Sequence, residues 1–378
     1  MTTAHRPAEC RAARLLVAFE LGEQTWKIGS TVGLGQVPRV RTVRTGEVAQ
    51  VLEELLRAKR RFGLPPEAPV ISCYEAGRIG FWLHRCLQAH GLTNYVVDSS
   101  SIEVPRRARR MKTDRLDRVA LVTLLGRYLA GDRRAWHVVR IPSVGEEDAR
   151  HLSRALEALT ADRTRLINRI RGLLSNYGVR LPVDRTFPEA GQTARLWDER
   201  PLPPGVVARL TREWAHLRYL TDELRTANAR QVPDPATPAG RHILQLETLR
   251  GVGRTSAWVL TTEIFAWRQI RNRRELAALV GLVPGRYQSG ETDRAEGIRR
   301  AGNVHVRRVI VQLAWAWLRY QPASALARWY ARRFASSKRL RRIGIVAVAR
   351  KLLIALWRYV DRGVVSDGAV LKPLGMPA

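Results

Sequence analysis

Two short stretches decide the fold of the N-terminal region. Residues 15–20 read Leu-Leu-Val-Ala-Phe-Glu and residues 69–75 read Pro-Val-Ile-Ser-Cys-Tyr-Glu, so each is an apolar run that ends in an acid. Strand-like runs and stretches of helical spacing alternate around them, at residues 26–29, 37–43, 47–62, 80–90 and 94–98. Strands separated by helices are typical of an α/β domain with a largely buried sheet, which we place at residues 12–142.

The middle of the chain, residues 144–235, has a different pattern. Apolar residues recur there at spacings of four and three in two stretches, namely Leu152, Leu156, Leu159, Leu166, Ile170, Leu173 and Tyr177, then Val206, Leu210, Leu217, Leu220, Leu224 and Ala227. A proline-rich segment, 182–204, separates the two stretches. The spacing predicts two long helices in an antiparallel hairpin or a coiled coil, and contact within the chain and contact between two copies stay equally open.

The third region, residues 243–365, is predicted to be mostly helical and is strongly basic. The whole chain of 378 residues has 65 basic and 34 acidic residues, a net charge of +31, and only six of the basic residues are lysine. From residue 241 onward there are 26 basic residues against 8 acidic ones. This balance argues against an acidic metabolic enzyme and indicates a polyanionic partner, because arginine grips phosphate in a two-pronged fork.

The cysteines and the hydropathy pattern bear on location. Cys10, Cys73 and Cys86 have neither metal-ligand spacing nor a paired framework, which predicts a reduced, cytoplasmic protein. We see no signal peptide, and the most apolar stretch, 343–357, is interrupted by charge, so we expect no membrane partner.

Four acids form the first candidate site. Glu20 and Glu75 each end a predicted strand, and Asp114 and Asp117 stand at the start of a predicted helix, three residues apart on one face. Carboxylates that converge from strand ends and a helix start can bind divalent cations through oxygen. Two such ions stabilise both the attacking and the leaving oxygen in phosphodiester displacement. The alternative is that Asp114 only caps its helix, with Asp117 in the first turn.

A glycine turn forms the second motif. Residues 249–257 read Leu-Arg-Gly-Val-Gly-Arg-Thr-Ser-Ala, the pattern of a helix-hairpin-helix. Gly251 and Gly253 let backbone N–H groups approach a phosphate at a helix start, and Arg254 follows directly. We favour contact with a DNA backbone over the alternative of a plain turn between two helices.

A serine in a glycine-rich stretch forms the third motif. Ser289 lies in residues 281–290, Gly-Leu-Val-Pro-Gly-Arg-Tyr-Gln-Ser-Gly, which we expect to be a flexible loop. A serine hydroxyl attacks phosphorus only when a base or metal activates it, so a surface serine in a turn is the alternative. Arg294, Arg299 and Arg300 then lead to Gly302-Asn303, which is expected to break one helix and cap the next.

Taken together, the motifs resemble the transposases of the insertion-sequence family numbered one hundred and ten. The resemblance covers roughly residues 15–360. Its most specific pieces are Tyr74-Glu75-Ala76-Gly77-Arg78 with Phe81-Trp82-Leu83-His84, the segment from Arg106 to Asp117, and the segment from Leu246 to Asn303. Three such pieces in the family's order are more specific than any one of them.

The resemblance implies an architecture and an activity. Residues 12–142 would form a RuvC-like domain of the RNase H fold, 144–235 a helical coiled-coil linker, and 243–365 a mostly α-helical transposase domain with a helix-hairpin-helix. Glu20, Glu75, Asp114 and Asp117 would bind magnesium or another divalent cation. Ser289 would attack the DNA phosphodiester. Most family members have aspartate at the first of these acids, where this chain has Glu20.

The family excises an element and inserts it at a target. The resemblance therefore implies donor and target DNA, a structured non-coding guide RNA, and a homo-oligomer, either dimer or tetramer, acting at the nucleoid in the bacterial cytoplasm. Base pairing with the RNA reads sequence while the protein reads shape and backbone. Arginines near the serine would position the phosphate, namely Arg286, Arg294, Arg299 and Arg300. A basic run before the two aspartates would lie along a nucleic-acid backbone, the alternative being a solvated basic loop, and it comprises Arg106, Arg107, Arg109, Arg110 and Lys112.

Two other functions remain open from the residues. A metal-dependent RuvC-like nuclease, such as a junction resolvase, needs only the four acids, and the segment from 246 to 303 would then be surplus. A non-catalytic basic nucleic-acid-binding protein explains the charge but not the acids at strand ends. Substitution of Ser289 separates the transposase from these two alternatives, because only the transposase needs the serine.

Overall fold

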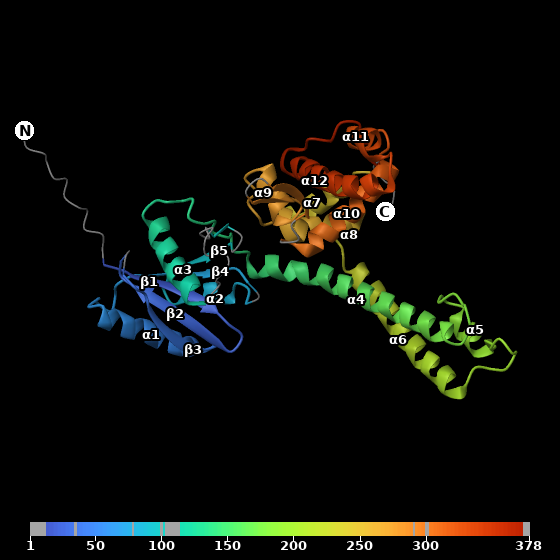
Figure 1. Ribbon diagram of the computed structural model, residues 1–378, viewed down its shortest axis with the longest axis horizontal. Coiled ribbons are helices and arrows are strands. Elements are labelled where there is room, and N and C mark those ends of the chain that lie inside the picture. The colour runs from blue at the N-terminus through green and yellow to red at the C-terminus, as the bar shows by residue number, and fades with distance from the viewer. Residues whose placement is uncertain are drawn as a thin grey trace, which may run out of the picture. The chain divides into compact units, whose positions relative to one another are not determined.

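The computed structural model describes residues 13–33, 36–77, 79–98, 101–102, 114–289, 292–298 and 302–372, and for 114–120, 284–289 and 292–296 it gives only the course of the backbone. The chain divides into two compact parts, Met1–Pro142 and Ser143–Ala378, which we call unit 1 and unit 2. Figure 1 shows their elements. No helix in the described part of the chain is long and apolar enough to cross a bilayer.

Unit 1 contains a five-stranded sheet. The strands are β1 (Leu15–Leu21), β2 (Thr25–Thr31), β3 (Arg39–Arg44), β4 (Val70–Glu75) and β5 (Thr93–Val97). Their order across the sheet is β3-β2-β1-β4-β5. β1, β2 and β3 are antiparallel neighbours, whereas β4 runs parallel to β1, and β5 runs parallel to β4. The carboxyl ends of β1, β4 and β5 therefore lie at one edge of the sheet.

Helices cover both faces of this sheet. They are α1 (Val48–Arg61), α2 (Trp82–Ala89) and α3 (Asp114–Leu129). Leu15, Val17 and Phe19 of β1 pack into one core with residues of α1 and α2. Leu16 and Ala18 pack into a second core with residues of α3. This alternation follows the two-residue period of a strand and explains why the strands read as continuous apolar runs.

Unit 2 begins with a helical hairpin, seen in green and yellow in Figure 1. Its helices are α4 (Val144–Ser175), the short α5 (Phe187–Thr193) and α6 (Pro204–Ala229). A capping box starts α4, because the Ser143 side chain accepts from the Glu146 N–H while the Glu146 carboxylate accepts from the Ser143 N–H. The two stretches of four-three spacing lie on α4 and α6, and their leucines pack on each other within the chain.

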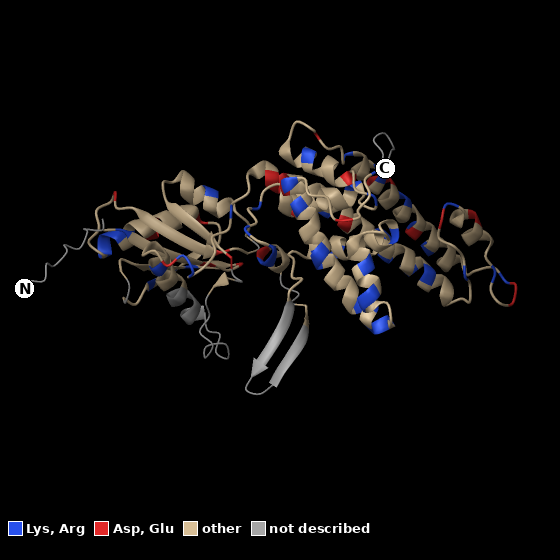
Figure 2. Ribbon diagram, turned by 90° about the horizontal axis from the view of Figure 1, so that it is seen from above, with Lys and Arg blue, Asp and Glu red and all other residues tan. Residues whose placement is uncertain are grey.

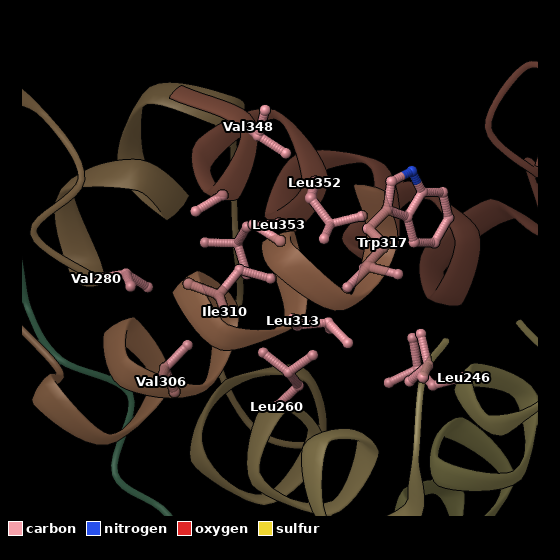
Figure 3. Packing of buried hydrophobic residues seen from close by; sticks show 14 of the residues in the cluster. Leu246, Leu260, Val280, Val306, Ile310, Leu313, Trp317, Val348, Leu352 and Leu353 are labelled. Carbon is pink, nitrogen blue, oxygen red and sulfur yellow. The ribbon is translucent and has the colours of Figure 1, made fainter. Parts of the chain in front are cut away.

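The rest of unit 2 is a block of helices around one core. Its elements are α7 (Pro238–Glu247), α8 (Arg254–Leu260), the π-helical η3 (Thr261–Phe265), α9 (Arg273–Leu279), β6 (Pro284–Ser289), β7 (Thr292–Ile298), α10 (Val304–Tyr320), α11 (Ala325–Phe334) and α12 (Lys338–Arg362). Figure 3 shows Leu260, Ile310, Leu313 and Leu353 gathered in this core. Each buried leucine or isoleucine contributes about 1.5–3 kcal/mol relative to exposure.

The structure corrects one expectation in this block. The segment around Ser289 was expected to be a flexible loop, but β6 and β7 form an antiparallel hairpin in which Ser289 pairs with Thr292. The element before Asn303 is therefore strand β7, not a helix. Asn303 itself is the N-cap of α10, as expected, since its side chain accepts a hydrogen bond from the Val306 N–H at 3.0 Å.

Candidate active site

Glu20 and Glu75 lie on the same face of the unit 1 sheet. Leu16 and Ala18 of β1 and Cys73 of β4 pack against α3. Since successive strand residues point to opposite faces, Glu20 and Glu75, each two residues beyond a member of that core, share the face that α3 covers. Glu75 is exposed and Glu20 is half-buried, so both carboxylates are accessible to solvent.

The two acids also lie at the same level. The parallel register of β1 and β4 ends with Phe19 opposite Tyr74, and Glu20 and Glu75 are the next residues of the two strands. Burial, together with the nearby negative charge of Glu75, raises the pKa of the Cys73 thiol. The strand ends therefore bring two of the four predicted acids together.

A lysine stands beside this pair. Lys27 of β2 is the cross-strand partner of Glu20, and its Nζ lies 4.0 Å from Glu20 Oε1. Both side chains are about one-third exposed, at 32% and 33%. An ion pair this accessible to water contributes little to stability.

Asp114 and Asp117 begin α3, the helix that packs on the same face as Glu20 and Glu75. Only their backbone is described, and the meeting of their carboxylates with the two glutamates stays a prediction. Among the side chains that are described, no three His, Cys, Asp or Glu groups could hold a metal ion together. The basic run before them lies outside the described residues, namely Arg106, Arg107, Arg109, Arg110 and Lys112.

Ser289 is the last residue of β6 in unit 2. Tyr287 pairs with Arg294 across the hairpin, and Arg286 pairs with Ala295. Because cross-strand partners share a face and alternate residues along a strand also share one, positions 289 and 294 fall on one face of the hairpin and position 286 on the other. Arg299 and Arg300 lie outside the described residues.

A buried carboxylate that the sequence analysis did not single out lies in η3 of unit 2. Glu263, in η3, is 1% exposed. Its oxygens accept from Nε and Nη2 of Arg154, on α4, at 2.8 and 3.1 Å, and from Nδ2 of Asn303 at 2.8 Å. The same Asn303 side chain therefore caps α10 and binds Glu263. Three elements distant in sequence meet at one carboxylate.

The charge of Glu263 is maintained by these donors. Burial alone would raise its pKa, but the hydrogen bonds from Arg154 and Asn303 and the positive charge of Arg154 outweigh burial, so the pKa is lowered. A second acid, Glu157 on α4, binds His305 and Arg308 of α10. The contacts of Glu263 and Glu157 join the start of α10 to the first half of α4. The start of α10 follows closely in sequence on the hairpin that carries Ser289.

The glycine turn lies between α7 and α8, as the motif predicts. Gly251 has φ +89°, and a Cβ there would approach Tyr320 Cβ to 3.1 Å, whereas Gly253 is the exposed N-cap of α8 with φ −98°. Arg254 is engaged within the chain, because its Nε and Nη2 bind Glu247 at 2.8 and 3.3 Å. Contact between this turn and a phosphate stays a prediction.

The two glycines make a matched pair for substitution. Gly251→Ala should destabilise the protein by about 1–2 kcal/mol, since it forces a side chain into the left-handed region. Gly253→Ala should cost less, because nothing lies within 4 Å of its Cβ position and its φ suits alanine, so that only the poorer N-cap character of alanine remains. Urea denaturation of both variants measures the difference, and equal losses would show that the turn is not held as described.

Comparison with known proteins places these features in a family. Residues 244–329 match the family described as Transposase IS116/IS110/IS902. A protein of Sinorhizobium fredii named as a transposase, y4rJ, is 38% identical over 375 residues, covering 95% of this chain and 94% of the relative. The chain belongs to the IS116/IS110/IS902 family of transposases.

Two further relatives carry the same description. The transposase for insertion sequence element IS1328 of Yersinia enterocolitica is 26% identical and covers 62% of this transposase and 70% of the relative. The transposase for insertion sequence element IS1111A of Coxiella burnetii is 27% identical and covers 55% and 56%. The family match begins in α7 and ends in α11, so it spans Glu263, the β6–β7 hairpin and Asn303.

Proposed function

We propose that this transposase cuts and rejoins DNA with Ser289 as nucleophile and with a divalent cation bound by carboxylates. A structured guide RNA recognises the target DNA. Support comes first from the sheet, where adjacent strand ends place Glu20 and Glu75 on the face that α3 covers. Strand order β3-β2-β1-β4-β5, with three antiparallel strands followed by two parallel ones, supports a RuvC-like domain of the RNase H fold.

The metal proposal rests on the donor set. Glu20, Glu75, Asp114 and Asp117 offer only carboxylate oxygens, which suit Mg²⁺ rather than a thiolate-seeking metal. A bound ion of this kind would offset negative charge on the attacking and leaving oxygens. Glu20 is half-buried and Glu75 is exposed, so both carboxylates are accessible to an ion from solvent.

The covalent step is a transesterification. The Ser289 hydroxyl gives up its proton, its Oγ forms a bond to phosphorus, and the bond from phosphorus to one sugar oxygen breaks, with that oxygen taking up a proton. A sugar hydroxyl of the second DNA strand then reverses the exchange, which restores the serine and joins the strands. Arg294 shares a hairpin face with Ser289, so it is the better placed of Arg286 and Arg294 to offset charge at the phosphate.

The remaining parts of the proposal concern partners. A net charge of +31 supports contact with donor and target DNA and with the guide RNA. The apolar faces of α4 and α6 pack on each other, so a dimer or tetramer would use other surfaces of this helical hairpin. We place the reaction at the nucleoid, where the donor and target DNA lie.

Substitution of a carboxylate tests the proposal. Glu75→Gln keeps the shape of the side chain but removes its charge, so DNA cleavage with Mg²⁺ and RNA transcribed from the ends of the element should fall about 10²–10³-fold. Glu67→Gln is the matched control, because Glu67 is an exposed acid in the same unit. Cleavage of labelled donor DNA is the readout. Cleavage by Glu75→Gln at the rate of Glu67→Gln would rule out the carboxylate site.

A further inference from the structure

Unit 2 carries a cationic surface where α11 ends and α12 begins. Every residue from 331 to 343 is exposed except Phe334, which is half-buried. Five exposed basic side chains in this stretch define what we call the α11–α12 cationic surface, namely Arg332, Arg333, Lys338, Arg339 and Arg342. Figure 2 shows Lys and Arg, in blue, distributed along the helices of unit 2.

The charge here is of one sign. Residues 325–360 contain ten basic residues and no acid. The helical hairpin has a different balance, since residues 144–232 contain 15 basic and 12 acidic residues. A high arginine content by itself therefore does not explain the surface. What distinguishes it is the lack of acids that would neutralise the arginines locally.

The described structure does not use these five cations internally. Neighbouring Arg328 approaches Asp367, and Arg341 donates to the Ala335 carbonyl at 3.1 Å. None of Arg332, Arg333, Lys338, Arg339 and Arg342 has a hydrogen bond or ion pair to another described residue. Arg154 and Arg254, in contrast, each bind a carboxylate through two nitrogens.

The position of three of these cations is unfavourable in the isolated chain. Lys338, Arg339 and Arg342 lie in the first turns of α12, a helix of 25 residues whose first turn has no acid. The partial positive charge of a helix N-terminus repels cations, which is why acids usually stand there, as Glu146 and Glu147 do on α4. An anion bound at this surface would relieve both that repulsion and the repulsion among the side chains.

The shape and composition of the surface distinguish between double-stranded and single-stranded nucleic acid as the bound anion. Lys338, Arg339, Arg342 and Ile343 line a shallow hollow. The stretch from 331 to 343 has one aromatic residue, the half-buried Phe334, so it offers no exposed ring on which an unpaired base could stack. The arrangement fits regularly spaced backbone phosphates of a duplex better than a single strand.

We infer that the α11–α12 cationic surface binds the phosphate backbone of double-stranded DNA. It contributes contacts that position the duplex without reading its sequence. The inference deepens the proposed function by assigning it a DNA surface, and it rests on that function only in taking DNA as the substrate.

Duplex binding at several salt concentrations tests the inference. The triple variant Lys338→Gln/Arg339→Gln/Arg342→Gln should bind a 5′-labelled duplex of about 30 base pairs about tenfold or more weakly, with a salt slope smaller by about two to three. The control triple Arg171→Gln/Arg212→Gln/Arg218→Gln removes the same charge from exposed positions of the helical hairpin and should keep the wild-type slope. Fluorescence anisotropy of the full chain in EDTA measures both.

A charge-conserving variant distinguishes loss of charge from loss of folding. Arg339→Lys/Arg342→Lys keeps the charges and should keep the slope, since backbone phosphates require charge more than a guanidinium fork. Equal slopes for the two glutamine triples, or weaker binding of an RNA duplex with unchanged binding of DNA, would overturn the inference. Because EDTA prevents metal-dependent cleavage, the result does not depend on the serine chemistry, and failure of either proposal is seen separately.

Discussion

Ser289→Ala should abolish strand transfer, with a fall in rate on the order of 10⁶, because loss of a nucleophile removes the only route to the covalent intermediate. DNA binding should be unchanged. Ser289 ends a strand in a hairpin, and removal of one hydroxyl there leaves the backbone pairing with Thr292 intact. Transfer of a labelled donor end into target DNA, with Mg²⁺ and RNA present, is the measurement.

The control is Ser175→Ala, an exposed serine at the end of α4. It should transfer strands at the wild-type rate. Wild-type DNA cleavage by Ser289→Ala would show that the carboxylate site cuts DNA without the serine, as a metal-dependent nuclease does. The protein would then be a metal-dependent nuclease of the resolvase type and not a transposase with a serine nucleophile.

Arg154→Met should lower the stability of the protein by about 3 kcal/mol, since it leaves the buried carboxylate of Glu263 with the Asn303 amide as its remaining hydrogen-bond donor in the described structure. The value is at the low end for a buried pair because the Arg154 side chain is 41% exposed. For a unit of this size the melting temperature should fall by roughly 6–12 °C. Calorimetry of the full chain measures it.

A double substitution measures the interaction energy between Arg154 and Glu263. Arg154→Met/Glu263→Met removes the buried charge together with its partner, so it should be less destabilised than the sum of the two single variants. Additive losses would show that Arg154 and Glu263 act independently. Such a result would contradict the arrangement in which one carboxylate joins α4, η3 and α10.

The same carboxylate sets a pH dependence. The pKa of Glu263 is lower in the folded protein than in the unfolded chain, so its contribution is complete above the unfolded value of about 4.3 and is lost as pH falls through the folded value. Acid denaturation of the wild type should include this loss, and Glu263→Gln should lack it.

The sheet of unit 1 was predictable because its signals are local. Residues 15–20 and 69–75 alternate between two buried faces, and both runs end in an acid at the same edge. The β6–β7 hairpin was not predictable in that way, since residues 284–298 are rich in polar residues and glycine and lack an apolar alternation. The sequence predicts Ser289 as a candidate nucleophile but does not predict the strand that carries it.

The network at Glu263 was missed for a different reason. Its partner Arg154 is 109 residues away in sequence and Asn303 is 40 residues away, and no local pattern links them. The local sequence signal is an acid within a largely apolar stretch, residues 257–267, where a charge must find a partner once it is buried. An acid in such a stretch predicts a buried carboxylate that is paired with a residue distant in sequence.

The most direct test of the account is to trap the protein–DNA intermediate. Wild-type protein with Mg²⁺, element RNA and labelled donor and target DNA is quenched in denaturant, and the DNA-linked peptide is identified by mass spectrometry. We expect a phosphoserine link at Ser289 that is lost in Ser289→Ala and in Glu75→Gln. Cleaved DNA without a covalent adduct, or an adduct at another residue, would contradict it.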